Sequence, residues 1–580
     1  MNIKNSMLNL KNSSKRFPVT LSLSTILFVM LIIFNETREM MNNTQFETFS
    51  RIIMLMFMSL LLSLCLALYL EKTLFSLIKK ITIYIIGAVI LFLYYHYLLT
   101  SFNFVSMTRY FGVLVFLIIL FFFIPRIKIK NHFEMYTLKI FSGFFITLIY
   151  SLVLFLGVCA IIFTIDTLFE LNIDEVYYYY TFLFVSLIFA VSLFLSKIPI
   201  ENESLVKYNY SKTLKILLVY IVIPLITIYT LILYVYFAKI LITWQWPKGI
   251  VSHLVLWYAG ISVGVIFLTT PVANENPAIK MFKNLFPKAV LPLLTIMFIS
   301  IGLRVQQYGI TENRYYVILM GLWVTGIMIY FIFVKNLRNI IIPISLAITI
   351  FIAVLGPLSG YSMAKIGQNK RFDSILAANN MIEGEDIVPS LTISQEDKKE
   401  LNNIITYFDT YHQFKHLKAL PDDFETTDMK NIFGFDYVSQ YDYFEDQYLY
   451  YYLDMYNQLI YVKDYDYYLV ISGWNNEEKT IDNMKISYDY ESFILKISEG
   501  NKSLLNEDIL SFIKIIHENN YKNGLIEKES MPSIEDASFE IENEFVKVKF
   551  IFTNINGELN SNTNDIILEN AEFILLLQRK

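Results

Sequence analysis

The chain has 580 residues, is 55% hydrophobic and has a positive mean hydropathy, which excludes an ordinary soluble globular protein. Its charge is divided, because residues 1–371 carry a net +17 and residues 372–580 a net −22, and so acidic a second part strongly disfavours nucleic-acid binding. The two cysteines, Cys65 and Cys159, both lie in apolar runs, which excludes a disulfide framework and a cysteine-based zinc site.

Apolar runs near the length that crosses ~30 Å of hydrocarbon recur before residue 360. The first run is not a cleavable signal peptide, because it is long, has no small-residue cleavage site and is followed by more spans. We therefore predict a polytopic α-helical membrane protein with about eleven transmembrane helices, in which a cytoplasmic tail (1–16) precedes a helical bundle (17–357). The predicted spans are 17–34, 52–70, 81–99, 106–124, 138–165, 180–197, 214–237, 250–270, 288–303, 315–334 and 340–357.

The lysines and arginines of the short loops orient these spans. The N-terminal tail and alternate loops hold 20 of them, whereas the intervening loops hold 7. Lys365, Lys370 and Arg371 follow the last span and reduce the contrast to 20 against 10. The pattern predicts a cell membrane protein with a cytoplasmic N-terminus, and an odd number of spans then places the C-terminal domain outside the cytoplasm. One span more or fewer would reverse that last prediction.

The eighth span carries Gly260 and Gly264 in a G-x-x-x-G pattern, which predicts close packing against another helix inside the bundle. No ionisable residue lies near the centre of a span, which argues against an ion-driven pump. The loop 271–288 holds Glu275 between prolines and is interpreted as a turn that leads into a short basic helix at the membrane surface.

The turn between the ninth and tenth spans reads RVQQYGITENRYY over residues 304–316. Gly309 permits a tight turn and Thr311 can cap the next helix. The two arginines fit two interpretations, which stay open here. They reach the outer membrane interface with their charged ends, or they bind an anion such as a lipid phosphate. The candidate contacts of that anion or lipid are Arg304, Gln307, Tyr308, Thr311 and Arg314.

A connector (358–394) is predicted to lead from the last span to an acidic soluble α+β domain (395–580). Residues 395–418 and 503–520 have helical periodicity, with Ser503 as a cap of the second helix. The region 447–498 and two closing runs, 539–554 and 570–580, are rich in aromatic and β-branched residues, which predicts strands. About 190 residues are enough for a separate core.

No residue set in this domain predicts chemistry. His412 and His416 lie four residues apart on the first predicted helix, one turn after Asp409, but no zincin-type glutamate lies between them. His412 also belongs to the apolar face of that helix. The chain has no nucleophile elbow, P-loop or dinucleotide fingerprint. We predict no metal, no cofactor and no catalytic residue.

The turn at 304–316 resembles a motif of an uncharacterised bacterial family of multi-pass membrane proteins, the domain of unknown function 4153. The motif has the form R-x-x-Q-Y-G-[IL]-T-x-x-R-Y, which here falls on Arg304, Gln307, Tyr308, Gly309, Thr311, Arg314 and Tyr315. Residues 356–371 and the DYDYYLVIS stretch (464–472) are also similar to that family. The resemblance implies many spans followed by a domain, and it brings no established activity.

Three functions from different classes remain. The first is a non-enzymatic protein that anchors or senses in the envelope, with an extracytoplasmic domain that meets a protein or an envelope polymer. The second is a transporter or lipid-handling protein that binds an anionic head group near Arg304 and Arg314. The third is a membrane-embedded transferase acting on a lipid-linked substrate, with acidic residues at the membrane faces. Its candidate residues are Asp166, Asp174, Glu175 and Glu275. The sequence does not determine the oligomeric state.

Overall fold

The computed structural model describes residues 13–580 except 72–74, 128–132, 201–209, 245–249, 274, 335, 385, 391, 422, 438–447, 456–458, 475, 523–529, 532 and 561–564. Most of the predicted cytoplasmic tail, residues 1–12, therefore lies outside the described residues. Two compact units make up the chain, Met1–Ser390 with Tyr407–Phe424, and Leu391–Thr406 with Glu425–Lys580. This division near residue 390 resembles the predicted one, but it groups 407–424 with the helical unit.

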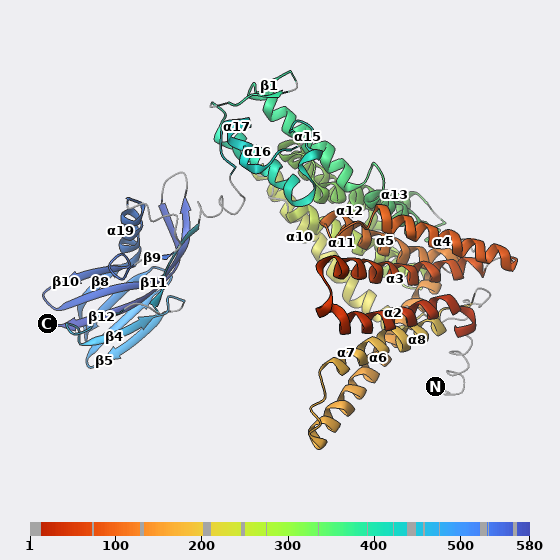
Figure 1. Cartoon of the computed structure of the whole chain (residues 1–580), viewed down its shortest axis with the longest axis horizontal. Coiled ribbons are helices and arrows are strands. Elements are labelled where there is room, and N and C mark those ends of the chain that lie inside the picture. Colours follow the sequence, from red (N-terminus) through yellow and green to blue (C-terminus); the bar gives the residue numbers. More distant parts are fainter. Residues whose placement is uncertain are drawn as a thin grey trace. The chain divides into compact units, whose positions relative to one another are not determined.

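The first unit is a bundle of long apolar helices (Figure 1), which confirms the predicted fold class. Within the described residues, ten stretches are long and apolar enough to cross a membrane, and each overlaps one of the first ten predicted spans. Several are broken by a short turn or by a π-helical segment, η3 (Phe184–Ala190) or η5 (Leu217–Val222). The α-helices are α2 (Pro18–Thr37), α3 (Asn43–Leu70), α4 (Leu77–Tyr97), α5 (Phe104–Phe123), α6 (Phe133–Phe169), α7 (Val176–Leu183), α8 (Val191–Lys197), α9 (Lys212–Ile216), α10 (Ile223–Thr243), α11 (Ile250–Thr269), α12 (Pro277–Tyr308) and α13 (Glu312–Phe333).

The eleventh predicted span is a helix of 14 residues, α14 (Ile341–Val354), which alone rises about 21 Å. The residues before and after α14 lengthen this pass along the bundle. Before α14, the backbone N–H of Arg338 donates to the Tyr330 hydroxyl near the end of α13, at 2.6 Å. After α14, the Leu358 carbonyl accepts from Tyr315 near the start of α13. Residues 338–358 therefore run the length of α13 in the opposite direction, and the chain passes the bundle an eleventh time.

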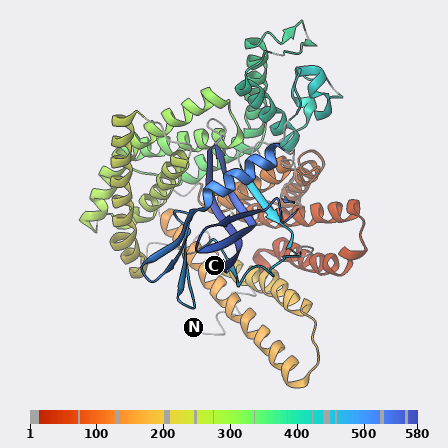
Figure 2. The same cartoon turned by 90° about the vertical axis from the view of Figure 1, so that its left-hand side faces the viewer.

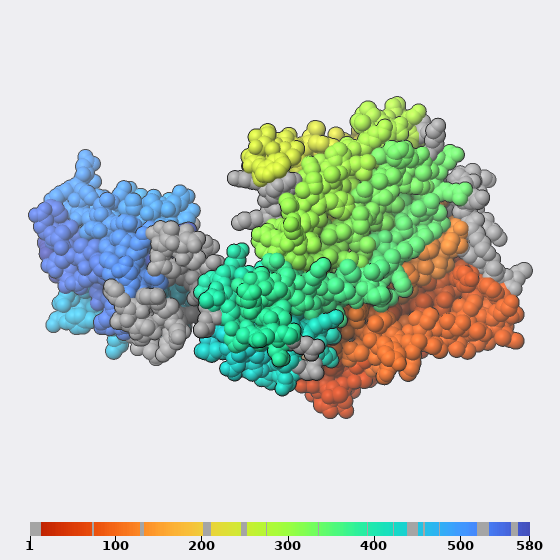
Figure 3. Space-filling model, turned by 90° about the horizontal axis from the view of Figure 1, so that it is seen from above, coloured from red at the N-terminus to blue at the C-terminus, as the bar shows by residue number. Residues whose placement is uncertain are grey.

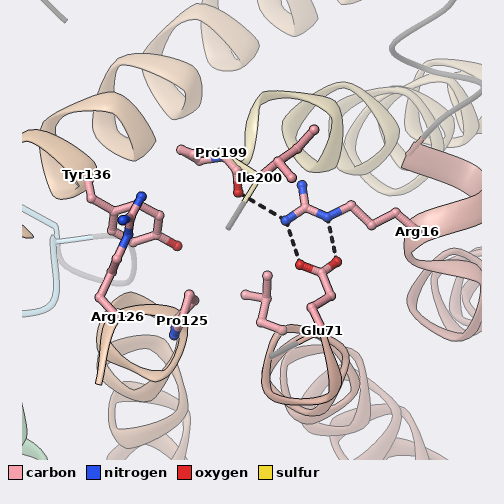
Figure 4. A pocket seen from close by; sticks show the side chains of 8 residues that line it. Arg16, Glu71, Pro125, Arg126, Tyr136, Pro199 and Ile200 are labelled. Atoms are coloured by element: carbon pink, nitrogen blue, oxygen red, sulfur yellow. Dashed lines mark hydrogen bonds and ion pairs between the residues drawn. The ribbon is translucent and has the colours of Figure 1, made fainter. Parts of the chain in front are cut away.

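Loops that are far apart in the sequence meet at one end of the bundle, which we call the basic end. The Arg16 guanidinium donates to both carboxylate oxygens of Glu71, at 2.6 and 2.9 Å, and to the carbonyl of Pro199 (Figure 4). It also donates to the carbonyl of Ile198. These residues come from the segments before α2, after α3 and after α8, all of which were predicted to lie on the same side. The contacts therefore support the up-and-down order of the first six spans.

Beside this ion pair, the Arg126 guanidinium lies over the ring of Tyr136, 4.7 Å from its centroid (Figure 4). The cavity between the two pairs measures about 10 Å³, room for about one water molecule. Both Arg126 and Tyr136 are almost fully buried. We interpret this end as a packed polar seam between helix ends rather than as a substrate pocket.

After the last pass the chain continues as α15 (Gly360–Ala378), followed by a small hairpin of β1 (Ile382–Glu383) and β2 (Asp386–Ile387). Helix α16 (Gln395–Tyr411) then begins in the second unit and ends in the first. It was predicted to reach residue 418, but a bend and a 3-10 turn (Phe414–His416) replace its last turn. Figure 3 shows α15 and residues 407–424 forming one continuous surface.

The second unit is built on two antiparallel β-sheets, in agreement with the predicted α+β domain. The larger sheet has the order β4-β12-β11-β3-β9, with β10 also paired to β11, and the smaller has the order β5-β6-β7-β8. Within the larger sheet β3 and β9 pair in parallel. The strands are β3 (Tyr448–Leu453), β4 (Tyr467–Ile471), β5 (Glu477–Ile481), β6 (Met484–Asp489), β7 (Ile494–Glu499), β8 (Lys502–Asp508), β9 (Ser530–Met531), β10 (Ser538–Glu542), β11 (Val546–Asn560) and β12 (Asp565–Arg579).

Aromatic side chains fill the core of this unit. Phe550 and Phe552 of β11 and Phe573 of β12 are fully buried, with ring centroids 5.6 to 6.5 Å apart. Helix α19 (Ile509–Lys522) lies against the sheet (Figures 1 and 2). Its Phe512 ring contacts Phe550, 5.3 Å between centroids. The predicted helix at 503–520 is thus correct from residue 509 only. Ser503 lies in β8 and caps nothing, because residues 502–508 pair with β7.

Candidate functional site

The R-x-x-Q-Y-G-I-T-x-x-R-Y segment forms the turn between α12 and α13. Helix α12 ends at Tyr308, and Gly309 follows with φ of +70°, a conformation that glycine adopts without strain. Thr311 occupies the N-cap position of α13, as predicted, although its side chain makes no capping hydrogen bond. The segment thus forms the tight turn that the sequence predicts.

The two arginines of this turn lie in different surroundings. Arg314 donates to the carbonyls of Tyr308 and Gly309, at 3.2 and 2.8 Å, and its guanidinium lies 5.6 Å from the centroid of the Tyr308 ring. It therefore closes the end of α12 by satisfying carbonyls that the helix leaves open. Arg304 is half-buried in the last turns of α12, while Gln307 and Tyr308 are exposed. Binding of an anion or a lipid head group by this turn stays a prediction.

Helix α15 holds the turn from the other side. The Gln368 amide donates to the carbonyl of Ile310, at 3.0 Å. Gly367 lies so close that a Cβ atom there would come within 2.0 Å of the Ile310 side chain, and a Cβ atom at Gly360 would come within 2.6 Å of the Tyr316 ring. These two glycines let α15 dock on the motif turn.

A buried carboxylate lies at the first residue of α13. Glu312 is 8% exposed, and its Oε1 atom accepts a hydrogen bond from the Tyr407 hydroxyl, at 2.5 Å. The same oxygen lies 3.3 Å from Nε2 of His412, which in turn lies 2.9 Å from the Tyr407 hydroxyl. Burial first, and then the Glu312 charge, raise the pKa of Tyr407 well above its ordinary value, so this hydroxyl keeps its proton and donates.

Further contacts hold the same segment. The Asn369 side chain of α15 donates to the carbonyl of His416 and accepts from the backbone N–H of Lys418, both at 2.8 Å. The Tyr411 ring contacts Phe104 at the start of α5, 5.1 Å between centroids. We call residues 407–418 the root segment. Tyr407, Tyr411, His412, His416 and Lys418 attach it to α5, α13 and α15.

The root segment meets the bundle at the end opposite the basic end, which we call the motif end. Here the Tyr361 hydroxyl of α15 donates to Thr108 of α5, at 2.8 Å. Burial raises the pKa of Tyr361 to about 12, so it also stays protonated. Neutral hydroxyls therefore donate the hydrogen bonds of Tyr407 and Tyr361, which suits a fixed attachment better than a reaction.

His412 and His416, which were considered above as metal ligands but not predicted to bind a metal, lie close to one another in the root segment. His412 faces Glu312 and Tyr407, and its ring centroid lies 6.2 Å from that of His416. Asp409 is exposed near the end of α16. Across the described residues, no group of three or more histidine, cysteine, aspartate or glutamate side chains could hold a metal ion.

The acidic residues considered for a transferase lie in structural contacts. Asp166 accepts from the backbone N–H of Ile173, and Asp174 accepts from that of Val176, so both organise the α6–α7 turn. Glu175 is exposed at the N-cap position of α7. Glu275 pairs with Lys215, at 2.8 Å.

Gly260 and Gly264 face open space instead of a neighbouring helix. A Cβ atom built at either would meet no described atom within 4 Å. Both line an apolar groove of about 260 Å³ between α11, α6, α13 and α14. Among the described residues, no neighbouring helix packs closely on these two glycines, and aromatic side chains such as Phe267 and Trp323 line the same groove.

Sequence reasoning missed the Glu312 network, although Glu312 lies within the motif turn as the residue after Thr311. Its partners follow 95 and 100 residues later, too far for a local pattern to connect. The one available signal was His412 on an apolar helix face, since a buried histidine requires a hydrogen-bonding partner.

Comparison with known proteins is consistent with this architecture. The family model described as "Domain of unknown function (DUF4153)" matches residues 48–389, which include the motif turn and all of α15. The "Uncharacterized protein PM1469" of Pasteurella multocida (strain Pm70) is 22% identical over 297 residues, 51% of this chain and 50% of that protein. The chain thus aligns with about half the length of this curated relative. No solved structure matches.

Proposed function

Since the family match covers more than half of the chain, the protein belongs to the DUF4153 family of membrane proteins, and from this premise we propose that it is a non-enzymatic anchor and sensor of the bacterial cell envelope. In this proposal the acidic second unit binds an envelope protein or polymer outside the cytoplasm. The root segment then transmits the effect of this binding to the helical bundle.

One observation carries the proposal. The root segment is held by the buried Glu312 carboxylate, and both of its flanks, 391–406 and 425 onwards, belong to the second unit. Any force on the second unit therefore reaches the root segment along two covalent connections. From the root segment, the Tyr407 hydrogen bond to Glu312 reaches α13, and the hydrogen bond from Asn369 to the His416 carbonyl reaches α15.

The proposed orientation follows from charge. Loops rich in lysine and arginine stay in the cytoplasm, so the basic end faces inward and the motif end outward. The eleventh pass through residues 338–358 makes the number of crossings odd, which supports an N-terminus and a second unit on opposite sides. Residues 372–580, which include the whole second unit, carry a net −22, and this charge also repels that unit from anionic lipid.

Sidedness can be tested by thiol labelling of single cysteines in a background without Cys65 and Cys159. We expect Asn313→Cys at the motif turn and Asn501→Cys in the second unit to react with a membrane-impermeant maleimide on intact cells. Asn284→Cys, exposed at the basic end, should react only after permeabilisation. If Asn284→Cys reacts from outside while the other two are protected, the orientation is reversed.

The binding role can be tested with a photo-activatable amino acid at Asn501 in the full-length protein. The proposal predicts a covalent adduct with an envelope protein or polymer after illumination of living cells. The matched site Asn284 should not give that adduct. Adducts with cytosolic proteins at Asn501, or none beyond those at Asn284, would contradict an envelope partner.

A further inference from the structure

A second feature of the motif end is a surplus of hydrogen-bond donors around Arg109, in the second turn of α5. The Nε atom of Arg109 is buried and has no hydrogen-bond partner among the described residues. The same holds for the hydroxyls of Tyr94 and Tyr316, and both hydroxyls lie within electrostatic range of the Arg109 charge. The Tyr94 side chain is itself more than nine-tenths buried.

Two further basic residues converge on this place. Tyr361 bonds to Thr108, the neighbour of Arg109, and Lys365 lies one turn after Tyr361 on the same face of α15. The Asn369 side chain then donates to the carbonyls of both Lys365 and His416, at 2.8 Å each, and the Lys365 charge acts on the His416 ring, so His416 lies near this face. The Nδ1 atom of His416 is buried and has no partner in the described part of the chain.

The charges of these groups act on one another. Burial first, and then the Arg109 charge, lower the pKa of Lys365. Burial first, and then the Lys365 charge, lower the pKa of His416. Buried donors and repelling cations are costly unless an acceptor of opposite charge lies among them. Glu312, a carboxylate of the same end, already accepts from Tyr407 and lies beside His412.

We propose that Arg109, Lys365, Tyr94, Tyr316 and His416 form a binding site for a phosphate-bearing anion at the motif end. An arginine and a lysine supply donors only, tyrosine hydroxyls can donate as well as accept, and a phosphate supplies acceptor oxygens with negative charge. The phosphate belongs to a lipid head group at the membrane interface or to a soluble anion. The site is independent of the proposed anchoring role.

This site differs from the one considered near Arg304 and Arg314. Two donors of Arg314 are taken by the carbonyls of Tyr308 and Gly309, whereas no described atom pairs with Nε of Arg109. A suitable control is Arg51, a second arginine of the bundle. Its guanidinium donates to the carbonyls of Leu99 and Tyr95 and lies over the Tyr95 ring.

The test compares full-length wild type with Arg109→Gln, Lys365→Gln and the control Arg51→Gln. Native mass spectrometry after detergent exchange counts phospholipid molecules retained per chain. Calorimetry with inorganic phosphate, in the same detergent, tests a soluble anion. Loss of a charged donor should lower retention or affinity by about tenfold or more for Arg109→Gln and Lys365→Gln. Arg51→Gln should match wild type.

The outcomes separate the two sources. Lipid loss that depends on Arg109 assigns a lipid head group, and a phosphate titration that depends on Arg109 assigns a soluble anion. Equal lipid retention and equal phosphate heats in all four proteins would overturn the proposal and leave water as the occupant. If Arg109→Gln does not fold, Arg109→Lys decides, because it keeps the charge and should retain intermediate binding.

Discussion

Replacing Glu312 with alanine is expected to destabilise the helical unit by about 3 kcal/mol, the largest effect that we predict for one side chain. The substitution removes the acceptor of the Tyr407 hydroxyl and the neighbour of His412, and it leaves both buried without that acceptor. Glu312→Gln should cost less, about 1 kcal/mol, because the amide oxygen can still accept from Tyr407.

The free energy of unfolding of the full-length protein in mixed micelles is measured by denaturant titration. Glu39→Ala is the matched control, since Glu39 is an exposed carboxylate in a turn of the same unit. The control should stay within about 0.5 kcal/mol of wild type. Equal stability of Glu312→Ala and Glu39→Ala would contradict a structural role for the network.

The second large effect is expected for Gly367→Ala, which should destabilise the same unit by about 1–3 kcal/mol. A Cβ atom at this position would lie 2.0 Å from Cγ2 and 3.2 Å from Cβ of Ile310, and a β-branched side chain cannot rotate away freely. The clash would push the motif turn off α15 and weaken the hydrogen bond between Gln368 and the Ile310 carbonyl.

A double-mutant cycle identifies this clash. Ile310→Ala alone costs apolar packing, but in combination with Gly367→Ala it removes the obstructing methyl group, so the double mutant should be more stable than the sum of the single effects. Gly326→Ala in α13 serves as control, because its Cβ atom would meet nothing within 4 Å. Additive effects of the two substitutions would show that Ile310 does not oppose a side chain at 367.

The membrane part of the fold could be predicted from sequence because one physical requirement dominates it. A helix that crosses hydrocarbon needs a long apolar run whatever its neighbours are. All ten long stretches overlap predicted spans for this reason. The eleventh differs, since Ile341–Val354 relies on its flanks to complete the pass, and flanks are set by contacts such as that between Arg338 and Tyr330.

Predictions that required a neighbour to be known were less successful. Gly260 and Gly264 suggested close helix packing, but a small-residue face does not determine which helix covers it. The same limit applied to residues 502–508, where pairing with β7 overrides a helical pattern that the sequence shares with α19. The motif turn was predicted correctly because Gly309 and Thr311 act locally, whereas Glu312 acts through residues about a hundred positions away.

The most direct test of the central claim, that the root segment is docked on the motif end of the bundle, is a cysteine cross-link between Phe104→Cys and Tyr411→Cys. The two rings lie 5.1 Å apart between centroids, and a short bifunctional thiol reagent should join the two cysteines in native membranes, in a background without Cys65 and Cys159. We expect an intramolecular cross-link as efficient as that between Tyr315→Cys and Leu358→Cys at the same end. A cross-link at 315–358 with none at 104–411 would contradict it.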